Sequence, residues 1–215
     1  MFHQPAMEAT RPAIRCQHIY RHILLPLFRC AYPNAGFPAS LTITEEQGAA
    51  NGGAAPGYVA VSGTAAALPD YFRVFVIAHE MAHIATVRCA SSLGALGPVP
   101  PGRGFNAFQK AELLADLIAL HLIREHLPAT YSQLLAHNAE AWPLFGDGDK
   151  MHPSASVRLS VLRRYVDRVS VGNAPRDVFR SLFATIWNEG GSDFHPRHPA
   201  SHGQLADEPR DRLPP

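Results

Sequence analysis

Residues 77–85 read IAHEMAHIA and lie within a longer helical pattern, LPDYFRVFVIAHEMAHIATVR, at 68–88. Residues four apart lie on one face of a helix, so that His79 and His83 can converge on one metal ion. Glu80 is turned about 100° from His79 and can reach a water molecule beside that ion as a general base. The flanking residues are apolar, and a charged glutamate in a buried stretch needs compensation. We therefore favour a metal site over the alternative, a helix that carries two ordinary histidines.

The spacing of these three residues is that of the HExxH motif, in which two histidines bind zinc and the glutamate acts as the base. The chain holds 12 histidines in 215 residues. At this composition the pattern would arise by chance roughly 0.03 times per chain. The motif alone is therefore suggestive. A third ligand is required, because a hydrolytic zinc site uses three protein ligands and leaves a fourth position for water.

A second helical pattern, NAFQKAELLADLIALHLIREHL at 106–127, offers the third ligand. This helix could be capped by Asn106 and is expected to stop at Pro128. Glu112 and Asp116 are four residues apart and share one of its faces. Glu112 can complete a set of two histidines and one glutamate, while Asp116 accepts the outer N–H of a ligand histidine. The alternative, two acids that merely face solvent, is disfavoured by the apolar residues around them.

The remaining patterns predict further helices and two short strands. They predict an α+β fold that is mostly helical, with a short antiparallel sheet packed on the two ligand helices. The predicted elements are a helix at 11–30 that bends or ends at Pro26, strands at 40–44 and 57–62 joined as a hairpin by a Gly/Ala-rich loop, a helix at 154–169 with Ser154 as a candidate cap, and a helix at 174–188 capped by Asn173.

The order of these segments resembles the gluzincin family of zinc metallopeptidases. HEMAH (79–83) is followed by FQKAELLAD (108–116), which has the ExxAD spelling of that family. DKMHPSASVRLSVL (149–162) is similar to the HPxxxxR segment in the soluble domains of the HtpX and CAAX-prenyl-protease group. The residues at 41–67 are similar to the strand, turn and strand that precede HExxH there. The resemblance covers about residues 40–162, and it extends to the soluble Lit-type phage-exclusion peptidases.

The resemblance implies a role for each residue of the two motifs. His79, His83 and Glu112 would be the zinc ligands, Glu80 the general base and Asp116 the residue that orients a ligand histidine. The expected fold is that of a minimal gluzincin, and Zn²⁺ is the expected cofactor.

The same resemblance implies how a substrate binds. In that group the strand before HExxH forms an edge along which an extended peptide lies. A protein or peptide substrate is therefore expected to pair as a strand beside GYVAVS at 57–62. The HtpX and prenyl-protease group carries transmembrane helices that this sequence lacks, so its membrane substrates cannot be carried over.

Two further residues are candidates for the site. His152, in the HPSASVR segment, could donate a hydrogen bond to the oxyanion of the tetrahedral intermediate. A turn residue that merely precedes a helix is an equal alternative. Arg158 could pair with Asp116 or another site carboxylate, or bind a substrate C-terminus, and a solvated helix arginine is the alternative. Cys89 is interpreted as a small core residue, and His121 lies on the face of its helix opposite the ligand face.

The composition suits a single metallopeptidase domain at 1–189, with a mobile Pro- and His-rich tail at 190–215. Nucleic acid is not an expected partner, because 19 Lys and Arg against 18 Asp and Glu are scattered and give a net charge of +1. Three widely spaced cysteines fit no disulfide framework, and the sequence shows no signal peptide or bilayer-spanning run. We therefore expect a cytoplasmic protein with no membrane partner, whose oligomeric state the sequence leaves open.

The leading hypothesis is a soluble zinc endopeptidase that hydrolyses a peptide bond through a metal-activated water. A second hypothesis is a non-catalytic interaction module, in which the ion braces two helices and no peptide is cut. A fourth protein ligand would favour bracing, whereas an open fourth position would favour catalysis. A third possibility is a secreted effector that uses the same protease chemistry.

Overall fold

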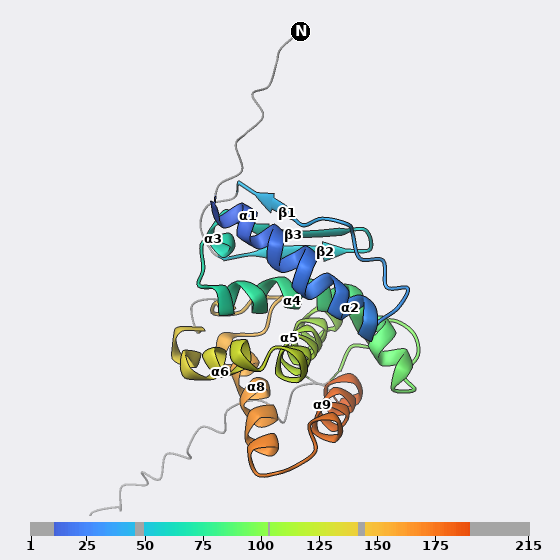
Figure 1. The fold of residues 1–215 in the computed structure, drawn as a ribbon. Helices are drawn as coiled ribbons and strands as arrows, with labels where there is room; N and C mark the ends of the chain where they lie inside the picture. Colours follow the sequence, from blue (N-terminus) through green and yellow to red (C-terminus); the bar gives the residue numbers. More distant parts are fainter. Residues whose placement is uncertain (1–10, 46–49, 103, 142–144, 190–215) are drawn as a thin grey trace, which may run out of the picture.

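The structure is a computed structural model, and it describes residues 11–45, 50–102, 104–141 and 145–189. Helices make up most of it, and a small sheet lies at one side of the helical body (Figure 1). The mostly helical α+β fold predicted from the sequence is therefore confirmed. The tail predicted at 190–215 lies outside the described residues. Buried apolar side chains from α1 through α9 belong to one hydrophobic core.

The elements follow one another in the order printed in Figure 1. They are α1 (Arg11–His18), the π-helix η1 (Ile19–Leu24), α2 (Leu25–Ala31), β1 (Thr42–Thr44), β2 (Gly52–Ala55), β3 (Tyr58–Ser62), α3 (Gly63–Ala66), α4 (Asp70–Ser92), α5 (Ala107–His126), α6 (Pro128–Ala136), the 3-10 helix η2 (Asn138–Ala141), α8 (Ala155–Ser170) and α9 (Pro175–Glu189).

The sheet is mixed, with the strand order β1-β3-β2. The predicted antiparallel hairpin between 40–44 and 57–62 is wrong, because β1 pairs with β3 in parallel. The antiparallel partner of β3 is β2, which lies in the Gly/Ala-rich stretch that was interpreted as a loop. Only two residues, Pro56 and Gly57, join β2 to β3. Such a tight turn brings neighbouring strands together even where Gly and Ala have low strand propensity.

This topology corrects the predicted place of a substrate strand. β3 contains the last five residues of GYVAVS and already has a neighbour on each side, so that no further strand can pair beside it. β2 is an edge of the sheet, and its residues line the same cleft as the two histidines of the motif. Of the two edge strands, β1 and β2, β2 is therefore the one that borders this cleft.

Helix α4 lies between the sheet and α5, and it contacts both (Figure 1). The sheet packs chiefly on α4, which corrects the prediction that it packs on both ligand helices. The two ligand helices instead pack on each other, and small buried residues let their backbones approach. These residues are Ala78, Ala82 and Ala85 on α4 and Ala115 and Ala119 on α5. This close pair of helices carries the candidate metal ligands.

Several helix ends differ from their predicted positions. Pro26 does not end the first helical segment, which continues through η1 into α2, where the Leu25 N–H donates to the Tyr20 carbonyl, five residues back. Pro128 ends α5 as predicted but also begins α6, as proline can at a first helical turn. Asn173 was predicted to cap α9, but its side chain donates to the carbonyl of Arg168 near the end of α8.

The two helix starts nearest the site have different caps. Asn106 forms a complete capping box with Gln109, which confirms the predicted start of α5. Ser154 occupies the position before α8, but its hydroxyl makes no capping bond to the helix and contacts Ser156 instead.

Candidate metal centre

Three side chains from α4 and α5 meet at one point. His79 and His83 lie one turn apart on α4, and their Nε2 atoms are 3.0 Å apart. Glu112, on α5, places Oε2 3.3 Å from His79 Nε2 and Oε1 3.2 Å from His83 Nε2. Donor atoms held about 2.0–2.1 Å from a tetrahedral zinc ion lie roughly 3.3 Å from one another. The spacing of these atoms therefore fits a zinc ion, and the chemistry of the set, two imidazoles and a carboxylate, fits it as well.

A second layer of contacts fixes the orientation of His79. Its Nδ1 lies 2.8 Å from Asp116 Oδ1, one turn beyond Glu112 on α5. Because the carboxylate accepts the Nδ1 hydrogen, the lone pair of Nε2 faces the other ligands. Arg158, from α8, holds the same carboxylate with Nε to Oδ2 and Nη2 to Oδ1, both at 2.7 Å. The expected contacts of Asp116 with a histidine of the motif and of Arg158 with Asp116 are therefore present, and the orienting role of Asp116 stays a prediction.

Arg158 is buried and fixed from several sides. Its Nη1 lies 3.4 Å from Glu112 Oε2, and its guanidinium lies over the ring of Phe145 at 4.4 Å from the ring centre. The alternative interpretation of Arg158 as a solvated helix residue is therefore wrong, because the residue is only 7% exposed. A buried guanidinium with two carboxylate partners neutralises charge that the two acids would otherwise leave unpaired.

These contacts shift the pKa values of the buried groups. Burial opposes protonation of His79, but the Asp116 carboxylate, with help from Glu112, outweighs it and raises the pKa of His79 to about 10. Burial opposes ionisation of Glu112, but hydrogen bonds to His79 and His83 prevail and lower its pKa. Burial likewise opposes ionisation of Asp116, and the Arg158 guanidinium and His79 lower its pKa. Without a metal ion the two carboxylates are therefore charged and His79 is protonated, so that metal binding would release the Nε2 proton of His79.

Glu80 lies between α4 and the sheet, next to β2. Burial raises its pKa, whereas the nearby histidines act in the opposite direction. A carboxylate whose pKa moves towards neutrality is better suited to accept a proton from water. Its position depends on Gly52 of β2, because a Cβ atom at that glycine would lie 2.6 Å from the Glu80 Cδ. Only a residue without a side chain lets the edge strand run this close to Glu80.

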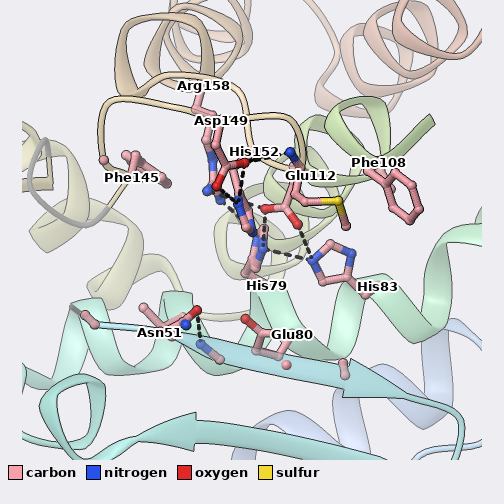
Figure 2. Close-up of a pocket in the computed structure, with 18 of the residues that line it drawn as sticks. Asn51, His79, Glu80, His83, Phe108, Glu112, Phe145, Asp149, His152 and Arg158 are labelled. Carbon is pink, nitrogen blue, oxygen red and sulfur yellow. Dashed lines mark hydrogen bonds and ion pairs between the residues drawn. The ribbon is translucent and has the colours of Figure 1, made fainter. Parts of the chain in front are cut away.

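A cleft of about 580 Å³ opens above the ligand group (Figure 2). β2 and the preceding Asn51 form one wall, and α5 and the turn before α8 form the other. Figure 2 shows Phe145 at one end of the ligand group and Phe108 at the other, with Glu80 facing the ligands from beside β2. The ligands therefore lie at the floor of an open groove that runs beside a strand edge.

The turn before α8 brings Asp149 and His152 to the rim of this cleft. Asp149 Oδ1 accepts hydrogen bonds from the His152 N–H at 2.7 Å and from His152 Nδ1 at 3.1 Å. The backbone hydrogen bonds hold the pKa of Asp149 below its usual range. Gly148 makes the turn possible, since its φ is +88° and a Cβ would lie 2.6 Å from the Ser154 nitrogen. His152 lines the cleft with 47% of its side chain exposed, so both readings of it stay open.

Two residues that were not expected to belong to the site, His121 and Cys89, lie away from the cleft. His121 is buried against α8 and α9, where its Nδ1 lies 2.9 Å from the Tyr165 hydroxyl and its ring stacks on Phe179. Cys89 is buried in the core, and burial raises the pKa of its thiol to about 12. Both predictions are confirmed. Among the described residues, no helix is both long enough and apolar enough to span a membrane.

Sequence reasoning missed three parts of the site. No sequence pattern indicated a role for Gly52, since the Ala/Gly-rich stretch around it resembles a linker. Asp149 could have been found as a carboxylate three residues before a candidate histidine, a spacing that permits a side-chain contact in a turn. Phe145 contacts Arg158 only through tertiary packing, which no local pattern reveals.

Comparisons of the chain with protein-family models, with curated proteins and with solved structures return no match. The interpretation of the site therefore depends on the geometry of its own residues.

Proposed function

We propose that the protein is a zinc-dependent endopeptidase. The observation that carries the proposal is the spacing of the three donor groups, whose atoms lie 3.0 to 3.3 Å apart at the floor of a cleft that Glu80 also lines. Zinc held by His79, His83 and Glu112 would polarise the scissile carbonyl and raise the acidity of a nearby water molecule. The resemblance to gluzincins agrees with this assignment.

The remaining steps fall to the protein's own side chains. The Glu80 carboxylate takes a proton from the attacking water and passes it to the leaving amine. Asp116 keeps His79 in the tautomer that leaves Nε2 free, and Arg158 keeps Asp116 charged. His152, which lines the cleft, would donate a hydrogen bond to the oxyanion.

The substrate would bind as an extended strand along the β2 edge. Gly52, Gly53 and Ala54 of β2 line the cleft, and they carry no side chain larger than a methyl group. An extended peptide could therefore approach the strand closely and form main-chain hydrogen bonds with it. A chain lying there would pass over the ligand group and beside Glu80, as peptide hydrolysis requires.

The second hypothesis, a metal that only braces two helices, has less support. Within the described residues, the group of side chains able to share a metal consists of His79, His83 and Glu112. A structural zinc site is closed by a fourth protein ligand, whereas a catalytic one leaves a position open. The cleft above the ligands favours the open arrangement.

The test combines metal analysis with proteolysis. We expect about one zinc per chain by elemental analysis, and cleavage of unfolded protein substrates that stops when a chelator removes the metal. Glu80→Gln keeps the size and the hydrogen-bonding capacity of the side chain but cannot accept the proton. This variant should retain zinc and lose cleavage. A folded chain that binds no zinc, or a Glu80→Gln variant with unaltered cleavage, would contradict the proposal.

A further inference from the structure

Two large apolar side chains are exposed beside the candidate metal centre. Phe108 is 59% exposed and Met151 is 45% exposed, and both line the cleft above the candidate metal centre. Phe108 precedes Glu112 by one helical turn, so that the two residues lie on the same face of α5. Figure 2 shows Phe108 on the side of the ligand group where His83 lies, away from Phe145. Single exposed apolar residues are common, but two in one cleft indicate a binding surface.

The segments that carry these side chains are fixed to one another. The Asn106 side chain donates to the Lys150 carbonyl at 2.6 Å, and the Gln109 side chain donates to the Asp149 carbonyl at 2.9 Å. The same two residues form the capping box of α5. The turn that bears Met151 is therefore attached to the first turn of the helix that bears Phe108. A binding surface prepared in this way loses little conformational freedom when a ligand arrives.

The wall opposite these two residues leaves room for a large group. It includes Gly53 and Ala54 of β2, whose side chains are a hydrogen atom and a methyl group. Phe108 contributes a rigid aromatic face, and Met151 a flexible thioether that adapts to different apolar shapes. The space between the walls therefore suits a bulky apolar side chain better than a small or charged one.

We propose that Phe108 and Met151 form a subsite for a bulky apolar side chain of the peptide, next to the bond that is cut. This inference rests on the proposed function and specifies its substrate class, which is a protein segment that presents a residue such as Phe, Leu or Met in extended conformation. Phe108 and Met151 determine specificity and take no part in the chemistry. Burial of an apolar side chain against these residues provides the selectivity.

The test measures binding without turnover. The full-length Glu80→Gln chain, loaded with zinc, is presented with a library of random decapeptides, and the retained peptides are sequenced. We expect enrichment of large apolar residues at one position. Phe108→Ser or Met151→Ser, each added to this chain, should weaken binding of an enriched peptide roughly tenfold. Phe108→Leu should keep most of the binding, because it preserves an apolar surface.

Tyr58→Ser is the matched control, since Tyr58 is an aromatic residue, 45% exposed on β3, that does not line the cleft. It should leave binding unchanged. Zinc content and circular dichroism establish that each variant is folded. Retained peptides without apolar enrichment, or enrichment that survives both serine substitutions, would overturn the inference.

The parent chain is given the same enriched peptides in parallel. Selective binding without cleavage would contradict the peptidase but leave the subsite in place. Cleavage with no preference for apolar residues would contradict the subsite but leave the peptidase in place. The two proposals can therefore fail separately.

Discussion

Arg158 and Asp116 form a buried bidentate ion pair, with two N–O distances of 2.7 Å, directly behind the candidate metal ligand His79. The pair joins α8 to α5, and through His79 it also reaches α4. The Asp116 carboxylate thus links α5 to α8 and α4, and it also contacts a candidate metal ligand. The separate consequences of this double role can be measured.

Loss of the guanidinium should destabilise the fold. Arg158→Met leaves Asp116 buried without its cationic partner, and breaking a buried pair in this way typically costs about 3–5 kcal/mol in the free energy of unfolding. Urea denaturation monitored by circular dichroism measures the loss. Arg163→Met, at an exposed position of α8, should change stability by less than about 0.5 kcal/mol. A loss below about 1 kcal/mol in Arg158→Met would show that the pair is not a stability determinant.

Loss of the Asp116 charge should weaken metal binding. Asp116→Asn keeps the side-chain shape but makes a poorer acceptor for the Nδ1 hydrogen of His79. Changes of this kind typically lower metal affinity by about 10- to 100-fold. Competition with a chromophoric chelator gives the zinc affinity. Asp167→Asn, an exposed acid on α8, should bind zinc like the parent chain. Equal zinc affinity in the two variants would count against the orienting role.

A methyl group at position 52 should displace the general base. In Gly52→Ala the new Cβ overlaps the Glu80 carboxyl group, whose side chain can rotate away, so that the fold and the zinc content persist. A displacement of about 1 Å at a reacting group can reduce turnover by about 10²-fold. Gly53→Ala adds the same methyl group where no atom lies within 4 Å, and its loss should be much smaller. Equal losses in the two variants would point to a general effect on β2.

The role of His152 can be separated from that of a turn residue. If His152 donates a hydrogen bond to the oxyanion, His152→Ala should lower kcat by about 10²- to 10³-fold. Its zinc content and stability should stay close to those of the parent chain. A merely structural turn residue would instead change stability and leave kcat per folded molecule unaltered. Steady-state kinetics and thermal unfolding of the same preparation distinguish these outcomes.

His121 should make the fold sensitive to acid. Burial lowers the pKa of His121 to about 4, against an ordinary value of 6.5 for the unfolded chain. Between these values unfolding takes up a proton, so that stability falls as the pH drops from about 6.5 to 4, by about 2–3 kcal/mol in all. His121→Gln, which can still bond to the Tyr165 hydroxyl, should flatten this part of the stability curve. His22→Gln, at an exposed position, should leave its slope unchanged.

The helical half of the site was readable from the sequence because its signals are local. The four-residue spacings of His79 to His83 and of Glu112 to Asp116 each define one face of one helix. Their apolar surroundings indicate that these faces are buried. Two buried faces with complementary ligands then have to meet, as the distances of 3.0 to 3.3 Å bear out.

The sheet side of the site could not be derived in the same way. Strand pairing depends on contacts between segments, and β2 has neither the alternation nor the β-branched residues by which strands are recognised. Its place in the sheet follows from the short turn at Pro56 and Gly57 and from the fit of Gly52 against Glu80. The open edge of the sheet was consequently expected at β3, which instead has a neighbouring strand on each side.

The small side chains of Gly52–Ala55 also affect how this protein could diverge from its relatives. At position 52 the constraint is an upper limit on side-chain volume, not a demand for a chemical group. Homologous chains could therefore differ widely in the amino-acid sequence of this segment while they keep a space of the same size beside Glu80. One glycine in a low-complexity run of glycine and alanine, easily dismissed as a spacer, would in that case be under steric selection because it lies against Glu80.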